Sequence, residues 1–145
     1  ILKMFTDSQL PTHASLNLTG RVLFTSLFFL SGLTHFTNIP YYVSLMPDEI
    51  PFPLFWIFVS GVVELVGATL ILLNQQARLG AWLIVLFMVP VTFAVHGFEM
   101  LFAESPAERA MQQAHFLKGL ALTGAALMLT QLGVQTTQRQ TVEAR

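Results

Sequence analysis

Cysteine is absent from the 145-residue sequence, which excludes thiol–disulfide chemistry, thiolate zinc sites and cysteine-ligated iron–sulfur clusters. Charged side chains are scarce: seven basic and eight acidic residues make up 10% of the chain, against about 25% in soluble domains. A small soluble domain exposes a large share of its surface, which so few charges could not cover. The net charge of −1 provides no basic face for a nucleic-acid partner. These absences leave an integral membrane protein.

Hydrophobic residues make up 54% of the sequence and are concentrated in four stretches. A membrane helix needs about 20 mostly apolar residues, and the stretches that meet this requirement are residues 17–37, 54–73, 79–100 and 113–133. Pro90 falls inside the third stretch, where a membrane helix can kink and continue. The sequence therefore predicts an all-α fold, an antiparallel four-helix bundle in the lipid bilayer. Residues 1–16 form a segment before the bundle, and residues 134–145 form a tail after it.

The few basic residues indicate the direction of the spans, because cytoplasmic loops of membrane proteins are enriched in Lys and Arg. Five of the seven basic residues lie before or near the start of the first span, between the second and third spans, or in the tail. They are Lys3, Arg21, Arg78, Arg139 and Arg145. The first long loop instead carries Asp48 and Glu49 and no basic residue. We therefore expect a multi-pass protein whose N-terminal segment and C-terminal tail both face the cytoplasm.

Each predicted span carries its ionisable groups on one helical face, at steps of three and four residues. In the first span this face consists of Arg21, Thr25, Phe28, Gly32 and His35. In the third span it consists of Val85, Val89, Thr92, His96 and Glu99. In the fourth span it consists of His115, Lys118 and Leu122, with Gly119 and Ala126 beside it. Small and polar residues mark the faces that pack against protein inside a membrane. We expect these faces to point into the bundle.

Three histidines fall at a similar depth on three different spans. With a rise of about 1.5 Å per residue, His35, His96 and His115 lie about 10–12 Å outside the membrane midplane. Glu99 lies one turn further out than His96, and Lys118 lies one turn deeper than His115. Because ionisable residues at membrane depth are costly and often functional, we expect these five residues to converge in a ligand site.

Two other ionisable residues lie deeper in the membrane. Glu64 falls near the midplane and Arg21 in the inner half, where both are candidates for buried polar or proton-carrying groups. The Glu64 carboxyl group could take part in proton transfer. Alternatively, it could be neutral, or paired with Lys118 or Arg21.

Three interpretations of the histidine layer remain open. A His and a carboxylate can hydrogen-bond a quinone headgroup and exchange protons with it. Neutral imidazole is also a common ligand of metals and haem. The third interpretation is structural, with the polar groups satisfying each other. A di-iron site is disfavoured because His96 and Glu99 form His-x-x-Glu, the reverse of the Glu-x-x-His order of di-iron bundles.

Several short motifs occur in an order and spacing typical of one family. They are Gly20-Arg21, Ser31-Gly32-Leu33-Thr34-His35, the Gly-x-x-Glu-x-x-Gly pattern of residues 61–67, Ala77-Arg78, His96 and Phe116-Leu117-Lys118-Gly119. Through them the chain resembles the DoxX family of small four-span membrane proteins over residues 20–132. The chain departs from the family pattern at Thr34 and His35, which stand where the family usually has a Lys.

The resemblance implies a bacterial-type inner-membrane protein of a kind that is often linked to redox complexes. Some family members look like the small subunit of a thiosulfate:quinone oxidoreductase, and others associate with oxidative-stress enzymes. The sequence thus favours a small membrane subunit of a redox complex, with quinone as the first candidate ligand and haem or a metal as the others. The alternative is a structural or assembly subunit with no catalytic site of its own. Whether the isolated chain is an enzyme is left open.

Overall fold

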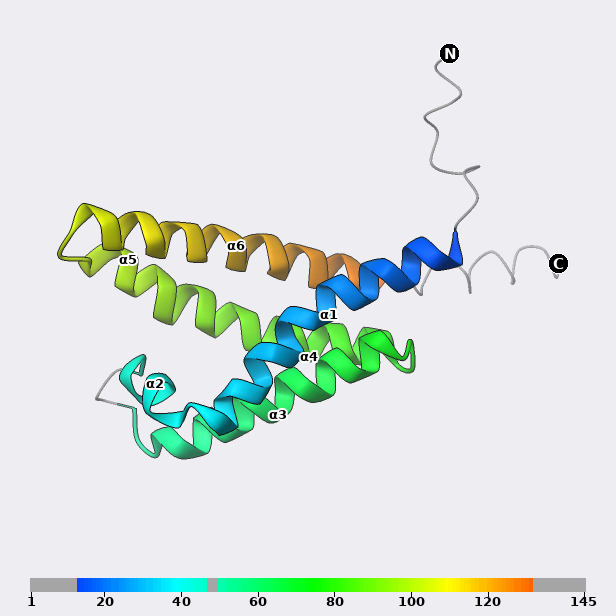
Figure 1. Cartoon of the computed structure of the whole chain (residues 1–145), viewed down its shortest axis with the longest axis horizontal. Coiled ribbons are helices and arrows are strands. Elements are labelled where there is room, and N and C mark those ends of the chain that lie inside the picture. Colours follow the sequence, from blue (N-terminus) through cyan, green and yellow to red (C-terminus); the bar gives the residue numbers. More distant parts are fainter. Residues whose placement is uncertain (1–12, 47–49, 132–145) are drawn as a thin grey trace, which may run out of the picture.

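The computed structural model describes residues 13–46 and 50–131, and this part of the chain contains helices and no strands (Figure 1). The elements in chain order are α1 (Ala14–Thr37), α2 (Ile39–Ser44), α3 (Pro53–Leu72), α4 (Ala77–Pro90), a π-helix (Val91–Gly97), α5 (Phe98–Phe102) and α6 (Pro106–Gln131). The predicted all-α fold is confirmed. Residues 1–12, 47–49 and 132–145 lie outside the described residues, and with them lie Lys3, Asp48, Glu49, Arg139 and Arg145.

Three helical segments of the described chain are long and apolar enough to cross a membrane, namely Ala14–Thr37, Pro53–Leu72 and Ala77–Phe102. The fourth long helix, α6, has 26 residues and therefore a length of about 39 Å. Its first half is more polar than the other three segments, since it carries Glu108, Arg109, Gln112, His115 and Lys118. The protein is thus a helical membrane bundle with three to four spans. That residues 113–133 form the fourth span stays a prediction.

Pro90 does not end the third span. The helix continues from α4 through Pro90 into the π-helix and then into α5, so that Ala77–Phe102 is one unbroken helical segment. Single π-helical turns are often found at functional sites. This one begins directly after Pro90, whose missing N–H removes one hydrogen bond of the α-helical ladder.

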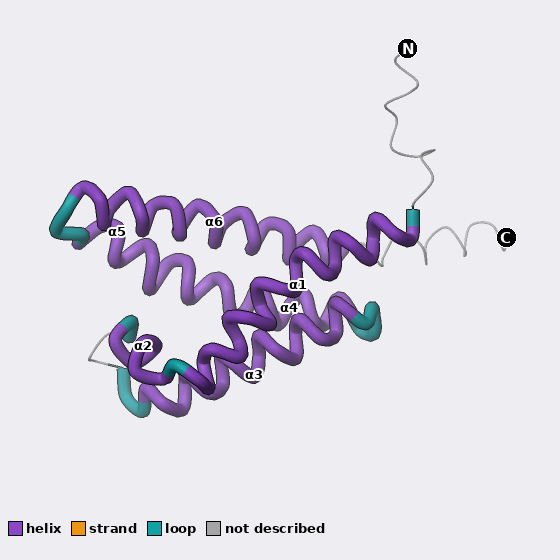
Figure 2. The backbone as a smooth tube through the Cα atoms, viewed as in Figure 1, coloured by secondary structure: helices purple, strands orange, loops and turns teal. Residues whose placement is uncertain are grey.

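The long helices pack in chain order. α1 packs on α3, α3 packs on α4, and α4 together with the π-helix and α5 packs on α6. At the end of the molecule that carries α2 and α5, the α1–α3 pair and the α5–α6 pair spread apart (Figure 2). Residues 14–20 of α1 are all exposed, so the first turns of this helix lie beyond the packed part of the bundle. Residues of all four long helices meet in one core away from the spread end.

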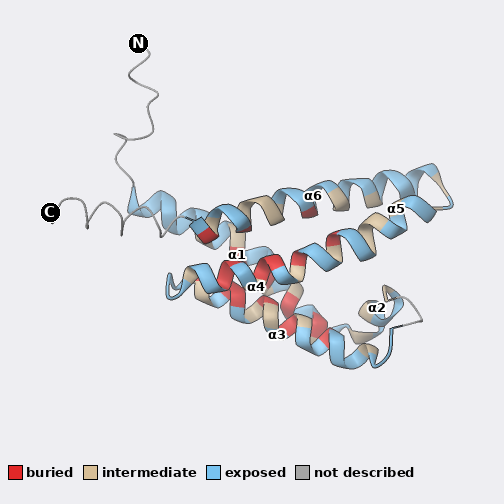
Figure 3. Ribbon diagram, turned by 180° about the vertical axis from the view of Figure 1, so that it is seen from behind, coloured by how far each residue is buried: buried red, intermediate tan, exposed pale blue. Residues whose placement is uncertain are grey.

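The apolar core lies where α3 and α4 meet their neighbours (Figure 3). Its buried side chains are Phe28, Ala68, Ile71, Ala81, Ile84, Val85, Met88 and Ala126. Gly67 and Gly80 allow the α3–α4 hairpin to close tightly, since a Cβ atom on Gly80 would lie 2.6 Å from the carbonyl oxygen of Gly67. Dispersion contacts of this kind hold helices together in lipid, where the hydrophobic effect contributes little.

Two arginines bind the C-terminal ends of helices at the other end of the bundle. Arg21 Nη1 donates to the carbonyl oxygen of Leu72 at the end of α3 (3.4 Å), and Arg78 Nε donates to that of Thr130 near the end of α6 (2.8 Å). A cation at a helix C-terminus is favourable because the free carbonyl groups carry partial negative charge. The two arginines thus lie at the same end of the molecule, the end predicted to face the cytoplasm.

The predicted inward faces agree with the structure for α1 and only in part for the last two spans. The buried residues of α1 are Thr25, Phe28, Gly32 and His35, as expected. In the third span Val85 and Thr92 are buried, whereas Val89 and Glu99 are exposed. In α6 the face that contacts the bundle carries Gly119, Ala126 and Thr130, and Lys118 is exposed. Glu99 and Lys118, which share the predicted inward faces, are thus exposed rather than buried. The buried face follows the small residues rather than the charges.

Candidate functional site

The structure divides the predicted histidine layer into two groups. His96 of the π-helix contacts His115 of α6, while His35 of α1 contacts Glu64 of α3. The reason is the spreading of the bundle at this end, which separates the α1–α3 pair from the α5–α6 pair (Figure 2). The expected convergence of all three histidines in one contact group is not observed.

The His96 and His115 imidazole rings are stacked, with centroids 5.0 Å apart and planes 20° apart. His96 Nδ1 lies 2.9 Å from Gln112 Oε1, and since this amide oxygen can only accept, Nδ1 carries the hydrogen. Lys118 Nζ lies 3.2 Å from His115 Nδ1. Since an ammonium group can only donate, Nδ1 of His115 is the acceptor. The two rings are therefore held in opposite tautomers, and the Nε2 atom is left as an acceptor in neutral His96 and as a donor in His115.

Gln112 connects this histidine pair to Glu99. Its Nε2 donates to Glu99 Oε2 at 3.5 Å, while its Oε1 accepts from His96. Both histidines are partly buried, whereas Glu99 and Lys118 are exposed. The sequence analysis missed Gln112. Its position three residues before His115 places it on the same face of α6, and this spacing could have identified it.

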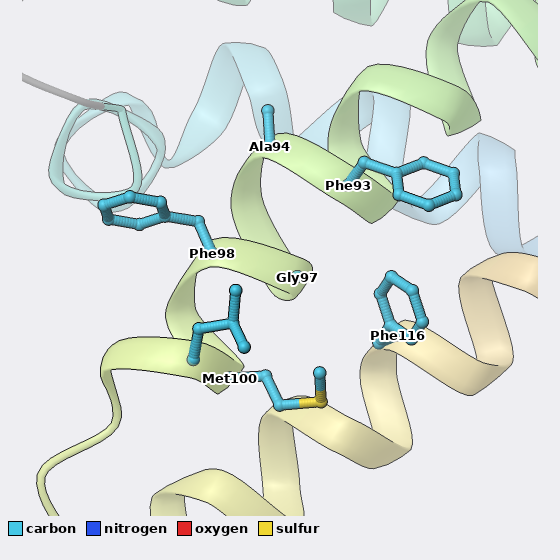
Figure 4. Close-up of a pocket in the computed structure, with 7 residues that line it drawn as sticks. Phe93, Ala94, Gly97, Phe98, Met100 and Phe116 are labelled. Carbon is cyan, nitrogen blue, oxygen red and sulfur yellow. The ribbon is translucent and has the colours of Figure 1, made fainter.

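An apolar groove lies between the π-helix, α5 and α6 (Figure 4). Its volume is about 490 Å³, and its lining residues are Phe93, Ala94, Gly97, Phe98, Met100, Leu101 and Phe116. The rings of Phe93 and Phe116 meet edge to face, with centroids 5.5 Å apart. Gly97 directly follows His96 in the chain, and Phe116 directly follows His115. The π-helix, α5 and α6 thus carry an apolar groove whose lining includes the residue after each histidine but neither histidine itself.

The second group surrounds Glu64, which is fully buried and faces the bundle interior, as predicted. Its partner differs from those expected. His35 Nδ1 lies 3.3 Å from Glu64 Oε2, and Ser31 Oγ donates to the same oxygen at 3.3 Å. The predicted pairing with Lys118 or Arg21 is not found, because Lys118 contacts His115 and Arg21 contacts the carbonyl oxygen of Leu72.

Two glycines bring His35 and Glu64 together. A Cβ atom on Gly61 would lie 2.8 Å from the Cβ atom of His35, and one on Gly32 would lie 3.2 Å from that of Glu64. The backbones of α1 and α3 can therefore approach closely only because both positions lack a side chain. Gly61 is the first glycine of the Gly-x-x-Glu-x-x-Gly pattern, which thus has a direct packing function.

The short helix α2 covers this group. The Tyr42 ring stacks on the His35 ring with centroids 3.8 Å apart, and Phe87 of α4 meets His35 edge-on at 5.9 Å. The Tyr42 hydroxyl group lies 2.6 Å from Thr34 Oγ1 and donates to the carbonyl oxygen of Ser31 at 3.3 Å. The sequence analysis did not identify Tyr42 as part of a site, because a tyrosine in a membrane-boundary loop is typical of an interfacial anchor.

Neither group has the geometry of a metal site. Among residues 13–46 and 50–131, no three His, Cys, Asp or Glu side chains lie close enough together to hold a metal ion. The stacked rings of His96 and His115 also do not suit bis-histidine haem, in which a ring nitrogen from each side points at the iron. The arrangement fits hydrogen bonding and proton exchange better.

The fold and these two clusters define a small helical membrane protein with polar groups between its helices. The DoxX family model matches residues 16–97, which is more than half of the chain, and the chain belongs to the DoxX family. No curated protein and no solved structure matches the chain significantly. The family match includes His35, Glu64 and His96 and ends at Gly97. It therefore does not extend to α6, which supplies His115 and Lys118.

Proposed function

We propose that the chain is the quinone-binding membrane subunit of a redox complex, with the quinone headgroup bound at His96 and His115. The observation that carries this proposal is the stacked histidine pair, together with the apolar groove that is lined by the residue directly after each histidine, Gly97 and Phe116. A quinone has the matching chemistry, because it combines a ring with two oxygen atoms and an apolar tail. Ligand sites of this kind are mostly apolar, with a few polar groups that fix the orientation of the ligand.

The tautomers of the two histidines suggest different roles for them. His115 accepts from Lys118 at Nδ1, so its Nε2–H can donate to a quinone carbonyl oxygen. His96 donates to Gln112 from Nδ1, so its Nε2 can accept from a quinol hydroxyl group. Glu99 is joined to His96 through Gln112 and is exposed to solvent. It could exchange protons between His96 and the outer side.

The proposal includes a partner because quinone reduction requires two electrons and two protons. The histidines and Glu99 can carry protons but not electrons, so we assign the electron supply to a redox-active partner subunit. The resemblance to subunits of quinone-linked oxidoreductases supports the same assignment. If no quinone binds, the alternative function as a structural or assembly subunit replaces the proposed one.

Photoaffinity labelling tests where the ligand binds. The full chain in lipid nanodiscs is irradiated with a short-tailed quinone that carries a photoreactive group, and the labelled peptides are identified by mass spectrometry. We expect labels on residues 93–101 and on Phe116, and we expect excess unlabelled quinone to suppress them. Labelling that is spread evenly over lipid-facing residues, or that resists competition, would support the structural alternative.

A further inference from the structure

Glu64 is the most deeply buried ionisable group of the described chain. None of its surface is exposed, and its Oε1 atom has no hydrogen-bond partner among the described residues. Ser31 Oγ donates to Oε2 instead, and His35 Nδ1 also lies 3.3 Å from Oε2. An ionised group at this depth is costly unless its charge is balanced. The quinone site on the π-helix and α6 does not use this carboxyl group, so its role requires a separate account.

Among the described residues, His35 is the only basic side chain that forms an ion-pair contact with Glu64. The groups that face the pair are Ser31 from α1, Tyr42 from α2 and Phe87 from α4, and none of them is a cation. His35 Nδ1 lies 2.9 Å from the carbonyl oxygen of Ser31, which can only accept, so Nδ1 carries a hydrogen. The positions left for one additional proton are Nε2 of His35 and the carboxyl group of Glu64.

The charge of the pair depends on how many of these positions are filled. With neither filled, the pair carries a negative charge inside the membrane, and with both filled it carries a positive charge. With one filled, the pair is neutral, either as an acid next to a neutral imidazole or as a carboxylate next to an imidazolium. The neutral pair avoids the large cost of a net charge in a low-dielectric interior.

We propose that His35 and Glu64 form a second site, whose ligand is a single proton shared by the pair and shielded by Tyr42. The stacked Tyr42 ring covers His35, and the Tyr42 hydroxyl group is anchored to Thr34 and Ser31. This site is independent of quinone binding and would remain if the quinone proposal failed.

Spectroscopy of the full chain in nanodiscs at neutral pH counts the protons. The infrared carbonyl stretch of a protonated carboxylic acid reports on Glu64, and ¹⁵N NMR of labelled histidine distinguishes imidazolium from imidazole at His35. Glu64→Gln and His35→Gln assign the two signals, and the proton count itself is made on the unaltered protein. We expect one of the two protonated signals. Both signals together, or neither, would overturn the proposal.

Hydrogen–deuterium exchange tests the shielding by Tyr42. Tyr42→Ala removes the ring over His35 and the hydrogen bond of its hydroxyl group, and Val43→Ala is the matched control, since Val43 lies on the same helix and is exposed. Loss of one such hydrogen bond should accelerate exchange of the site proton about twofold to tenfold in Tyr42→Ala. Equal exchange rates in the two variants would contradict the shielding role. If Tyr42→Ala does not fold, Tyr42→Leu supplies the same comparison.

Discussion

Gly61 of α3 lies against His35 of α1 so closely that a single added carbon atom would meet the His35 Cβ atom at 2.8 Å. This contact sets the register in which α1 crosses α3, because it places Gly32 opposite Glu64 at the same time. The glycines of the family pattern therefore determine which polar side chain meets the buried carboxyl group. The Glu64 site is a consequence of backbone packing between two helices.

The first prediction concerns this packing. Gly61→Ala should destabilise the protein by about 1–3 kcal/mol, since an extra methyl group in a tight contact forces the helices apart. Gly20→Ala is the control, because no atom lies within 4 Å of a Cβ at that position. There Ala should stabilise the helix by about 0.5–1 kcal/mol. Thermal unfolding in detergent measures both changes. Shifts of the same sign would contradict the close contact of α1 and α3.

The second prediction concerns topology. Cysteines introduced at Asp48 and Ser105 should react with a membrane-impermeant thiol reagent from outside the cell, whereas cysteines at Gln75 and Gln138 should be protected. The absence of native cysteine makes each label specific. Labelling of Gln75 in place of Asp48 would reverse the predicted orientation. Labelling at both Ser105 and Gln138 would mean that α6 does not cross the membrane.

The sequence predicted the helices well and the neighbours of the histidines poorly. The buried face of α1 follows directly from its spacing of three and four residues. Depths counted from the centre of each span place His35 well outside the midplane and Glu64 near it, whereas the two side chains are in contact in the structure. The close approach of the α1 and α3 backbones at Gly32 and Gly61 brings them together.

The grouping of the histidines could not be predicted for a second reason. Matched depth does not say which helices are adjacent, and α1 packs on α3 while the π-helix packs on α6. The contact of Tyr42 with His35 depends on how α2 folds back over α1, and no periodic pattern encodes that fold. The π-helix after Pro90 was also missed, since a membrane proline predicts a kink without specifying its form.

The third prediction concerns the apolar groove. Phe116→Ala removes an aromatic ring that lines the groove, and it should weaken quinone binding. Leu117→Ala is the matched control, because Leu117 is the next residue of α6 and is mostly exposed. Equilibrium dialysis of a short-tailed quinone against nanodiscs measures both variants. A similar loss in the two variants would indicate partition into the lipid rather than binding in the groove.

The proposed quinone site depends on His96 and His115, which should both bind the quinone headgroup. The affinity of the full chain for the quinone and for its quinol tests this directly. One lost hydrogen bond changes stability by about 0.5–1.5 kcal/mol, so the affinity should fall about twofold to tenfold. We predict that His115→Ala mainly weakens binding of the quinone and that His96→Ala mainly weakens binding of the quinol, while His13→Ala changes neither affinity. Wild-type affinity for both forms in all three variants would contradict the account.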